Sequence, residues 1–238
     1  MHSSKKILIT GSSKGIGKAI AIRAAEERHS LILTARNADE LAELKKEIKD
    51  KDHALAVDVF VSDLGTREGT QKLIRHMQDN HSDLDVLINN AGVFMPGLIL
   101  DGSEADFEQM MEVNFYAAFH LTRGLLPAMI GREKGHIINI CSIAGQDPYP
   151  RAGLYSITKF AMQGFSRCLR DELKEKGIKV TTVYPGATWS NSWAGADLPE
   201  ARIMQASDVA ECVISSLRLS DSAVLEELVL RPQLGDLP

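Results

Sequence analysis

A tyrosine and a lysine stand four residues apart in the stretch "YSITK", which runs from Tyr155 to Lys159. It directly follows "PYPRAGL" at 148–154, a segment rich in turn-forming residues. If "YSITK" is helical, both side chains lie on one face, because residues four apart are neighbours on a helix surface. Two interpretations are open. The pair is either an aromatic anchor beside a solvated lysine, or a proton-transfer pair in which the ammonium stabilises the phenolate.

A glycine-rich segment follows the first apolar run of the chain. The run "KKILIT" at 5–10 leads into "TGSSKGIG", whose glycines are Gly11, Gly15 and Gly17. Such glycines let the backbone approach a pyrophosphate, and a helix that follows them offers its N-terminus to an anion. The spacing is G-x-x-x-G-x-G rather than the usual G-x-G-x-x-G, so an ordinary glycine turn is the alternative. An expected strand before the loop and helix after it favour a nucleotide.

Two cations stand where a dinucleotide's adenine ribose would lie. Arg36 follows the second apolar run, "SLILTA" at 30–35, where NAD-binding proteins usually carry an acidic residue for the ribose 2′-hydroxyl. A basic residue there suits the 2′-phosphate of NADP, and Lys14 in the glycine loop adds a second positive charge. Each alone is equally well read as a surface cation, but together with the missing acid they predict NADPH.

Polar groups also follow the later apolar runs. Asp58, with the backbone amide of Val59, is a candidate for binding an adenine edge, and a cap or turn role is the alternative. The next three runs end in residues that can tie loops together or form turns. These residues are Asn89, Asn90, Ser142 and Pro185-Gly186. Because ligands bind outside the carboxyl ends of parallel strands, this repetition predicts one shared site.

The elements that must position these residues alternate along the whole chain. Short apolar runs predict strands at 5–10, 30–35, 53–59, 85–90, 136–142, 179–185 and 223–230. Amphipathic stretches predict helices at 15–28, 38–50, 62–80, 104–131, 153–176 and 207–218. This alternation predicts an α/β Rossmann fold, with a doubly wound parallel sheet of about seven strands and helices on both faces. Without any linker-like segment, residues 1–238 are expected to form a single domain.

Composition narrows the function classes. A net charge of −5, spread over both signs, gives no electrostatic reason to expect nucleic acid or an anionic membrane as a partner. The N-terminal apolar run is too short for a signal peptide, and no run approaches the ~18 residues of a membrane span. Cys141, Cys168 and Cys212 have neither disulfide nor zinc spacing, which fits a reducing cytoplasm. The histidines are scattered, and His76 and His81 are expected at the surface, so no metal site is predicted.

The ordered motifs resemble those of the short-chain dehydrogenase/reductase family. "TGSSKGIG", "NNAG" at 89–92, Asn114, Ser142, "YSITK" and "PG" at 185–186 occur in the family's order. Ser142 precedes Tyr155 by 13 residues and Tyr155 precedes Lys159 by 4, as the family's pattern requires. The resemblance covers nearly the whole chain, and the ordered set is far more specific than the Tyr-x-x-x-Lys pair alone.

The resemblance implies a role for each of these residues. Tyr155 is expected to be the general acid for carbonyl reduction, and Lys159 to promote its phenolate and bond the nicotinamide ribose. Ser142 is expected to donate to the substrate oxygen. Asn114 is expected to kink its helix and hold a water linked to Lys159, or else to be a locally satisfied amide. The residues expected to bind NADP(H) are Gly11, Ser13, Lys14, Gly15, Ile16, Gly17, Arg36, Asp58, Val59, Asn90, Ala91, Gly92, Tyr155, Lys159, Pro185, Gly186, Thr188 and Ser190.

The segment after the sixth run is expected to meet the substrate. The family usually has a threonine four residues beyond the glycine of "PG", where it bonds the nicotinamide carboxamide. Ser190 stands at that place and retains the hydroxyl, and Thr188 is close enough to compete for the role. A substrate lid is expected around 187–205, in which Trp189 and Trp193 either line the pocket or pack the lid.

The ending "LEELVLRPQLGDLP" resembles bacterial sepiapterin-reductase-like members, a lineage that blends into 3-oxoacyl-carrier-protein reductases. The expected function is NADPH-dependent reduction of a small ketone, diketone or pterin side-chain ketone. A 3-oxoacyl-carrier-protein reductase and a dinucleotide-binding regulator without catalysis are the alternatives. Apolar residues on more than one face of the helices at 104–131 and 153–176, among them Phe115, Phe119, Phe160 and Phe165, predict a homodimer or homotetramer.

Overall fold

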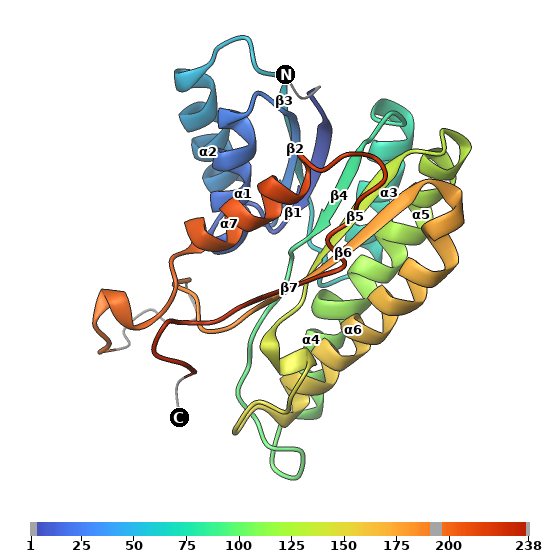
Figure 1. The fold of residues 1–238 in the computed structure, drawn as a ribbon. Helices are drawn as coiled ribbons and strands as arrows, with labels where there is room; N and C mark the ends of the chain where they lie inside the picture. Colours follow the sequence, from blue (N-terminus) through green and yellow to red (C-terminus); the bar gives the residue numbers. More distant parts are fainter. Residues whose placement is uncertain (1–3, 191–196, 237–238) are drawn as a thin grey trace.

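The computed structural model describes residues 4–190 and 197–236, which form a parallel α/β sheet protein. The sheet has 7 strands in the order β3-β2-β1-β4-β5-β6-β7, and every pairing is parallel (Figure 1). The strands are β1 (Lys6–Thr10), β2 (Ser30–Ala35), β3 (Val57–Val61), β4 (Val86–Asn89), β5 (Gly135–Ile140), β6 (Ile178–Pro185) and β7 (Glu227–Leu230). The strand order reverses direction between β1 and β4, so the predicted doubly wound fold is confirmed.

Helices cover both faces of the sheet (Figure 1). On one face lie α1 (Gly15–Glu26), α2 (Ala38–Lys51) and α7 (Ala206–Ser216), which share a core with alternate residues of β1 and β2. On the other face lie α3 (Arg67–Asn80), α5 (Ala117–Gly131) and α6 (Gly153–Leu173). In β1, Ile7 and Ile9 point to the first core and Leu8 to the second, as the alternation of a strand requires.

Local sequence signals fix where the helices begin. Asn37 caps α2 by accepting hydrogen bonds from the amides of Asp39 and Glu40. Thr66 caps α3 by accepting from the amide of Gly69. The helix predicted over 62–80 therefore begins only at Arg67, which leaves residues 62–66 as a loop at the carboxyl end of β3.

The helix predicted over 104–131 is interrupted. It consists of α4 (Glu104–Met111), a π-helical turn at Glu112–Tyr116, and α5. Asn114 lies within the π turn. Such turns occur mostly as single bulges inside α-helices and often at functional sites.

The third strand differs most from its predicted bounds. It was expected at 53–59 but runs from Val57 to Val61. The amide of Ala54 donates to Asp52 Oδ1 at 3.0 Å, so this stretch forms a turn instead. The strand continues through Phe60, whose aromatic ring suits a pleated surface. Asp58 therefore lies in the middle of the strand, with consequences for the predicted site.

Within the described parts of the chain, none of the helices combines the length and the hydrophobicity that crossing a membrane would require.

Candidate functional site

A cavity of about 570 Å³ opens at the carboxyl ends of the central strands. Its walls come from the glycine loop after β1, the start of α2, the loops after β3 and β4, the end of β5, and α6. Val113 of the π-helical turn and Ser190 after β6 complete the wall, so the structure brings segments from along most of the chain to one place. The predicted residues that line the cavity are Gly11, Ser13, Lys14, Gly15, Ile16, Arg36, Asn90, Ala91, Gly92, Tyr155, Lys159 and Ser190.

The glycine loop is built so tightly that side chains are excluded from it. Gly11 and Gly15 have φ angles of 62° and 53°, which favour glycine. A Cβ atom at Gly11 would lie 2.9 Å from the Cα of Ala91, and one at Gly17 would lie 2.2 Å from the carbonyl oxygen of Gly11. The cradle is therefore shaped by bare backbone, and α1 begins at Gly15 with its N-terminal amides at the cavity.

Asn90 joins the loop after β4 to the glycine loop. Its Nδ2 donates to the carbonyl oxygens of Thr10 and Gly11 at 2.8 and 3.1 Å. The hydroxyl of Thr10 in turn accepts from the amides of Asn90 and Ala91, both at 2.9 Å. The predicted tie between loops is confirmed for Asn90. Asn89 instead bonds side chains in the interior, with its Nδ2 2.8 Å from Asn139 Oδ1.

Tyr155 and Lys159 lie near the start of α6, on the wall of the cavity. Lys159 is only 5% exposed, and its Nζ lies 5.6 Å from the centroid of the Tyr155 ring. The ammonium also donates to the carbonyl oxygen of Ile140 at 3.3 Å. On its other side, the Tyr155 ring meets the edge of Phe94 at a centroid distance of 5.0 Å. The arrangement places a buried positive charge against a half-buried phenol.

Ser142 follows β5 and begins a short 3₁₀ turn, Ile143–Gly145. Its Oγ accepts a hydrogen bond from the amide of Ala144 at 3.1 Å. Ser142 is not part of the cavity wall itself, but its neighbour Cys141 is. The buried Sγ of Cys141 donates to the carbonyl oxygen of Lys159, which couples the end of β5 to α6.

Asn114 is fully buried and satisfied by three hydrogen bonds. Its Oδ1 accepts from the amide of Val93 at 2.7 Å, and its Nδ2 donates to the carbonyl oxygen of Val93 and to Thr158 Oγ1, both at 3.0 Å. Gly92 lies beside it, since a Cβ there would be 3.3 Å from Asn114 Oδ1 and 3.7 Å from Lys159 Nζ. The amide therefore links the loop after β4 to α6, next to the buried ammonium.

The cations at the other end of the cavity are joined by a carboxylate. Arg36 is exposed and lines the cavity, as predicted for a 2′-phosphate ligand. Lys14 Nζ, however, lies 2.5 Å from Glu40 Oε1, and Glu40 lines the same cavity. The hydrogen bond from Lys14 holds the pKa of Glu40 below its ordinary value. Sequence reasoning placed Glu40 only in the next helix and missed this contact.

The expectation for Asp58 and Val59 is wrong. Both lie inside β3 rather than after it, and the free amide that was expected to bind adenine, that of Val59, donates at 2.8 Å to Asp58 Oδ1. The loop after Val61 lines the cavity instead, through Ser62, Asp63, Leu64 and Gly65. The segment "SDLG" directly after the apolar run 57–61 was the signal that could have found them.

The histidines predicted to be at the surface are also placed differently. His76 and His81 are 21% and 15% exposed, and both direct a ring nitrogen at Asp58. None of these three residues lines the cavity.

The segment after β6 is described up to residue 190 and again from residue 197. Thr188 is buried, and its hydroxyl donates to the carbonyl oxygen of Gly186 at 2.9 Å. Ser190 lies against the glycine loop, where a Cβ at Gly15 would be 3.4 Å from its own Cβ. Trp189 donates from Nε1 to the carbonyl oxygen of Glu200 at 2.8 Å, outside the cavity wall. Trp193 lies outside the described residues. Further predicted residues that are described but do not line the cavity are Gly17, Pro185 and Gly186.

Comparison with known proteins identifies relatives along nearly the whole chain. Residues 5–199 match the model of the short chain dehydrogenase family. The chain is 31% identical to a sepiapterin reductase of Chlorobaculum tepidum, with 97% of each chain covered. It is 30% identical to an uncharacterized oxidoreductase of Staphylococcus saprophyticus, with 96% of this chain and 97% of the relative covered.

Two solved structures with the same fold are complexes with NADP or NADPH. A metagenomic short-chain oxidoreductase in complex with NADP has a TM-score of 0.84 and 28% identity, with 97% of this chain and 98% of that chain covered. L-sorbose reductase from Gluconobacter frateurii, complexed with NADPH and L-sorbose, has a TM-score of 0.88 and 28% identity, with 97% and 96% covered.

Proposed function

Because the chain belongs to the short-chain dehydrogenase/reductase family, a family of NAD(P)-dependent oxidoreductases, we propose that it uses NADPH to reduce a small carbonyl compound, with Tyr155 as the general acid. One observation carries the proposal. The buried ammonium of Lys159 stands 5.6 Å from the ring of Tyr155, on the wall of the cavity that the glycine loop also lines. A buried charge is poorly screened, so it stabilises the phenolate that forms when the proton leaves.

The chain's own groups manage the proton and the developing charge. NADPH supplies the hydride when bound. As the carbonyl oxygen becomes negative, the hydroxyl of Tyr155 donates its proton to that oxygen. Ser142 accepts from the amide of Ala144, which leaves its own hydroxyl proton to donate to the same oxygen. Lys159 stabilises the tyrosinate that remains.

Asn114 acts as a positioning residue in this proposal. Its amide holds both polar groups of Val93 and the hydroxyl of Thr158, which lies directly before Lys159. This fixes the distance between the loop after β4 and the first turns of α6. The water that the family resemblance implies here would lie beside Lys159 and would return a proton to the tyrosinate.

The residues present fit a phosphorylated dinucleotide. The bare cradle of glycines, together with the N-terminus of α1, suits a pyrophosphate. Ser190 rather than Thr188 suits the carboxamide, because Ser190 lines the cavity and Thr188 does not. The candidate ligands of the adenine end are Lys14 and Arg36 for the 2′-phosphate, and Asp63 with Leu64, in place of Asp58, for the base.

A small substrate is supported by the wall beside Tyr155. Phe94 presents an apolar, partly exposed ring next to the phenol, suited to a flat or apolar carbonyl compound. The relative that acts on sepiapterin and the structural neighbour that holds L-sorbose are consistent with this size. A 3-oxoacyl-carrier-protein reductase is the second candidate. A regulator without catalysis would not need the set of Asn114, Ser142, Tyr155 and Lys159.

The test is the change Tyr155→Phe, with turnover and cofactor binding measured separately. NADPH oxidation is followed with sepiapterin, small diketones and acetoacetyl thioesters, and NADPH binding by fluorescence titration. The variant is expected to lose ~10²–10⁴-fold in turnover, the scale of one general acid, and to keep NADPH binding because the ring still packs against Phe94. The matched control is Tyr116→Phe, on the helical layer outside the cavity, which is expected to retain full activity.

The outcomes separate the hypotheses. If Tyr155→Phe keeps more than half of the turnover, the catalytic assignment is wrong. Wild-type protein that binds NADPH but oxidises it with no carbonyl compound favours the regulator. Activity confined to acetoacetyl thioesters favours the carrier-protein reductase.

A further inference from the structure

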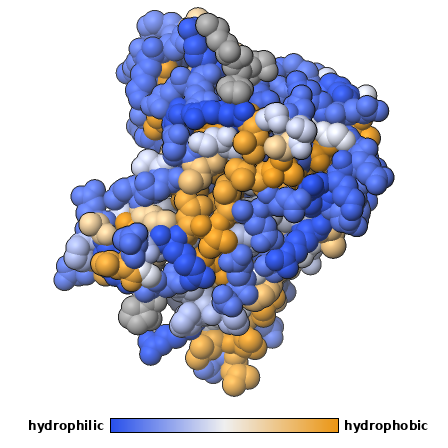
Figure 2. All heavy atoms as spheres, viewed as in Figure 1, coloured by the Kyte–Doolittle hydropathy of each residue, from blue (hydrophilic) through white to orange (hydrophobic). Residues whose placement is uncertain are grey.

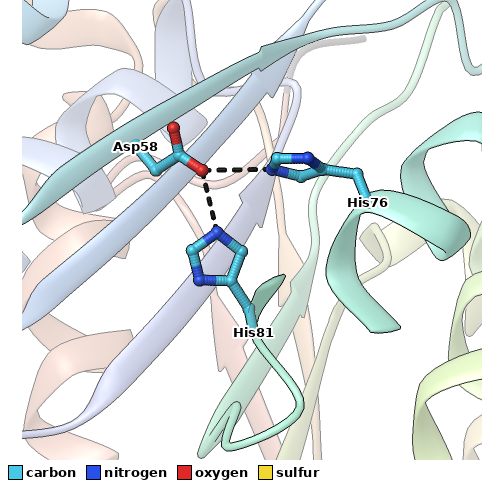
Figure 3. A group of neighbouring side chains, drawn as sticks. All are labelled: Asp58, His76 and His81. Atoms are coloured by element: carbon cyan, nitrogen blue, oxygen red, sulfur yellow. Dashed lines mark hydrogen bonds and ion pairs between the residues drawn. The ribbon is translucent and has the colours of Figure 1, made fainter. Parts of the chain in front are cut away.

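Asp58, His76 and His81 form a cluster (Figure 3), and none of the three lines the cavity. Asp58 lies on the edge strand β3, His76 near the end of α3, and His81 directly after α3. Both imidazoles direct Nε2 at the same carboxylate oxygen, Asp58 Oδ2, at 3.1 Å from His76 and 2.8 Å from His81 (Figure 3). The three potential ligand atoms all lie within 4.8 Å of one another.

These separations are close to those of a metal's ligand shell, so small side-chain movements would suffice to admit an ion. Zinc binds imidazole nitrogen and carboxylate oxygen at about 2.0–2.2 Å in tetrahedral geometry, which places neighbouring ligand atoms roughly 3.3 Å apart. Two imidazoles and one carboxylate are also the donors that zinc and similar first-row divalent ions accept, whereas Mg²⁺ and Ca²⁺ require oxygen ligands. We propose that Asp58, His76 and His81 bind a divalent transition metal ion, with zinc as the best match and water as the fourth ligand.

The three side chains are held in place by contacts outside the cluster. Asp58 Oδ1 accepts from the amide of Val59 at 2.8 Å, which leaves Oδ2 facing the histidines. The ring of His76 stacks on Phe60 at a centroid distance of 4.3 Å and an angle of 21°. The ring of His81 meets that of His76 edge-on, at 5.4 Å. Such preorganisation distinguishes a built site from side chains that merely meet.

Metal binding would shift a proton within each imidazole. A ligating Nε2 must be free of its proton, which then resides on Nδ1. The Nδ1 of His76 lies 3.4 Å from Asn80 Nδ2, which also donates to the carbonyl oxygen of His76 at 3.0 Å, so Asn80 would have to move aside when Nδ1 takes up the proton. The Nε2–H of His81 donates to Asp58, and its buried Nδ1 has no partner among the described residues, so metal binding would move the proton to a nitrogen that no described residue bonds.

The site would join an edge strand to the helix that covers it. In the described parts of the chain, β3 pairs only with β2. The helix α3 packs against β3 in the core that lies on the α3, α5 and α6 face of the sheet. An ion shared by Asp58, His76 and His81 would tie the strand to the C-terminal end of α3. Its effect is therefore expected on stability, not on turnover.

The experiment uses untagged full-length protein, stripped with chelator and titrated with zinc alone. We expect one zinc ion per chain by calorimetry, and a melting temperature about 5–10 °C higher at 100 times the dissociation constant. Mg²⁺ and Ca²⁺ should give no such shift. His81→Gln and Asp58→Asn are expected to weaken zinc binding at least about 10-fold, since both keep the side chain's size and lose a metal ligand.

The matched control is His53→Gln, because His53 is exposed and lies outside the cluster. It should bind zinc as the wild type does. Asp58→Asn is the more informative variant, since it preserves a hydrogen-bond acceptor for the histidines. The proposal is overturned if the wild-type protein takes up no zinc at a free zinc concentration of about 100 µM. A site weaker than roughly this would add little to stability. Zinc uptake that Asp58→Asn and His81→Gln leave unchanged also overturns the proposal.

Discussion

His136 is a buried histidine that the candidate site does not use. It lies in β5 with 6% exposure, and its Nε2 is 2.7 Å from Thr181 Oγ1 on β6. Burial lowers its pKa to about 3, and the positive charges of Lys179 and Lys5 act in the same direction. The folded protein therefore holds His136 neutral under all ordinary conditions.

This predicts a stability loss in mild acid. Between the unfolded pKa of about 6.5 and the folded pKa of about 3, the unfolded chain binds a proton at His136 that the folded chain does not. Unfolding is thus favoured as the pH falls through this window, by roughly 2 kcal/mol between pH 6.5 and pH 5 from this residue. Urea unfolding at several pH values measures it.

The variant His136→Gln is expected to flatten that part of the pH dependence, because glutamine does not titrate and can still bond Thr181. The change of shape also affects its stability at neutral pH, so the slope of stability against pH is the diagnostic quantity. His53→Gln, at an exposed position, serves as the control and should leave the slope unchanged. An unchanged slope in His136→Gln contradicts the assignment.

At the scale of elements, the start of α2 and the glycine loop together set the charge around the adenine ribose. Glu40 lies in the first turn of α2, and its Oε1 accepts a hydrogen bond from Asn37 Nδ2 at 3.0 Å. The same carboxylate forms an ion pair with the ammonium of Lys14. Arg36 has no such partner among the described contacts of the cavity. A 2′-phosphate arriving there meets two cations and one carboxylate.

We predict that Glu40→Gln tightens NADPH binding by a few-fold, up to about tenfold, and leaves NADH binding nearly unchanged. The change removes a negative charge from the phosphate's surroundings and releases Lys14, while glutamine retains the contact with Asn37. Fluorescence titration with both cofactors measures the ratio. Glu43→Gln, one turn further and exposed on α2, is the matched control.

Removing the two cations instead of the carboxylate tests the same role of charge in cofactor preference. Arg36→Ala combined with Lys14→Ala should weaken NADPH by roughly ten- to a hundredfold and NADH little. Wild-type protein that binds both cofactors equally, or a Glu40→Gln variant with the wild-type ratio, contradicts the proposed role of these charges.

The sequence predicted the elements well where strands are buried on both faces, because continuous apolar runs mark them clearly. It failed at β3, an edge strand in which Asp58 is tolerated because His76 and His81 bond it. The strand's end was predicted two residues too early, and the candidate adenine ligand was therefore placed at Asp58 rather than at Asp63. On an interior strand the same carboxylate would be more deeply buried, and its burial would cost more free energy.

Motif order located Tyr155, Lys159 and the glycine loop, since their spacing is local or fixed by the fold. Two features were beyond its reach. The ion pair of Lys14 with Glu40 depends on the angle at which α2 leaves the sheet. The cluster of Asp58 with the two histidines depends on how α3 packs on β3, across 18 and 23 residues of chain. Neither has a sequence signature.

At the scale of the whole molecule, the doubly wound sheet brings the cavity to one edge and leaves several apolar surfaces uncovered. Figure 2 shows exposed apolar residues over the β7 edge of the sheet, where Val229 is 50% exposed, and on a projecting loop. That loop, after β4, carries Leu98, Ile99 and Leu100. A further group lies on the helical layer of α4 to α6. Its exposed members are Tyr116, Ile157 and Phe160.

These surfaces support the predicted homo-oligomer. Phe115, Phe119 and Phe165 pack against one another between α5 and α6, with ring centroids 5.7 to 6.0 Å apart, and so are satisfied within the chain. Phe160 lies on the same helix as Phe165 but is not covered within the chain, since 39% of it is exposed. Water-exposed aromatic and branched side chains gathered on neighbouring helices mark an association surface.

We therefore predict that the protein is a dimer or tetramer, and that Phe160→Glu lowers its mass. A glutamate in an apolar contact would be desolvated without a partner, which disfavours association. Light scattering at micromolar concentration measures the mass of the wild type and of the variant. Val61→Glu, at a position that is also exposed but lies on the edge strand β3, is the control and should retain the wild-type mass. A monomeric wild type contradicts the prediction, and a variant of unchanged mass moves the association surface away from α6.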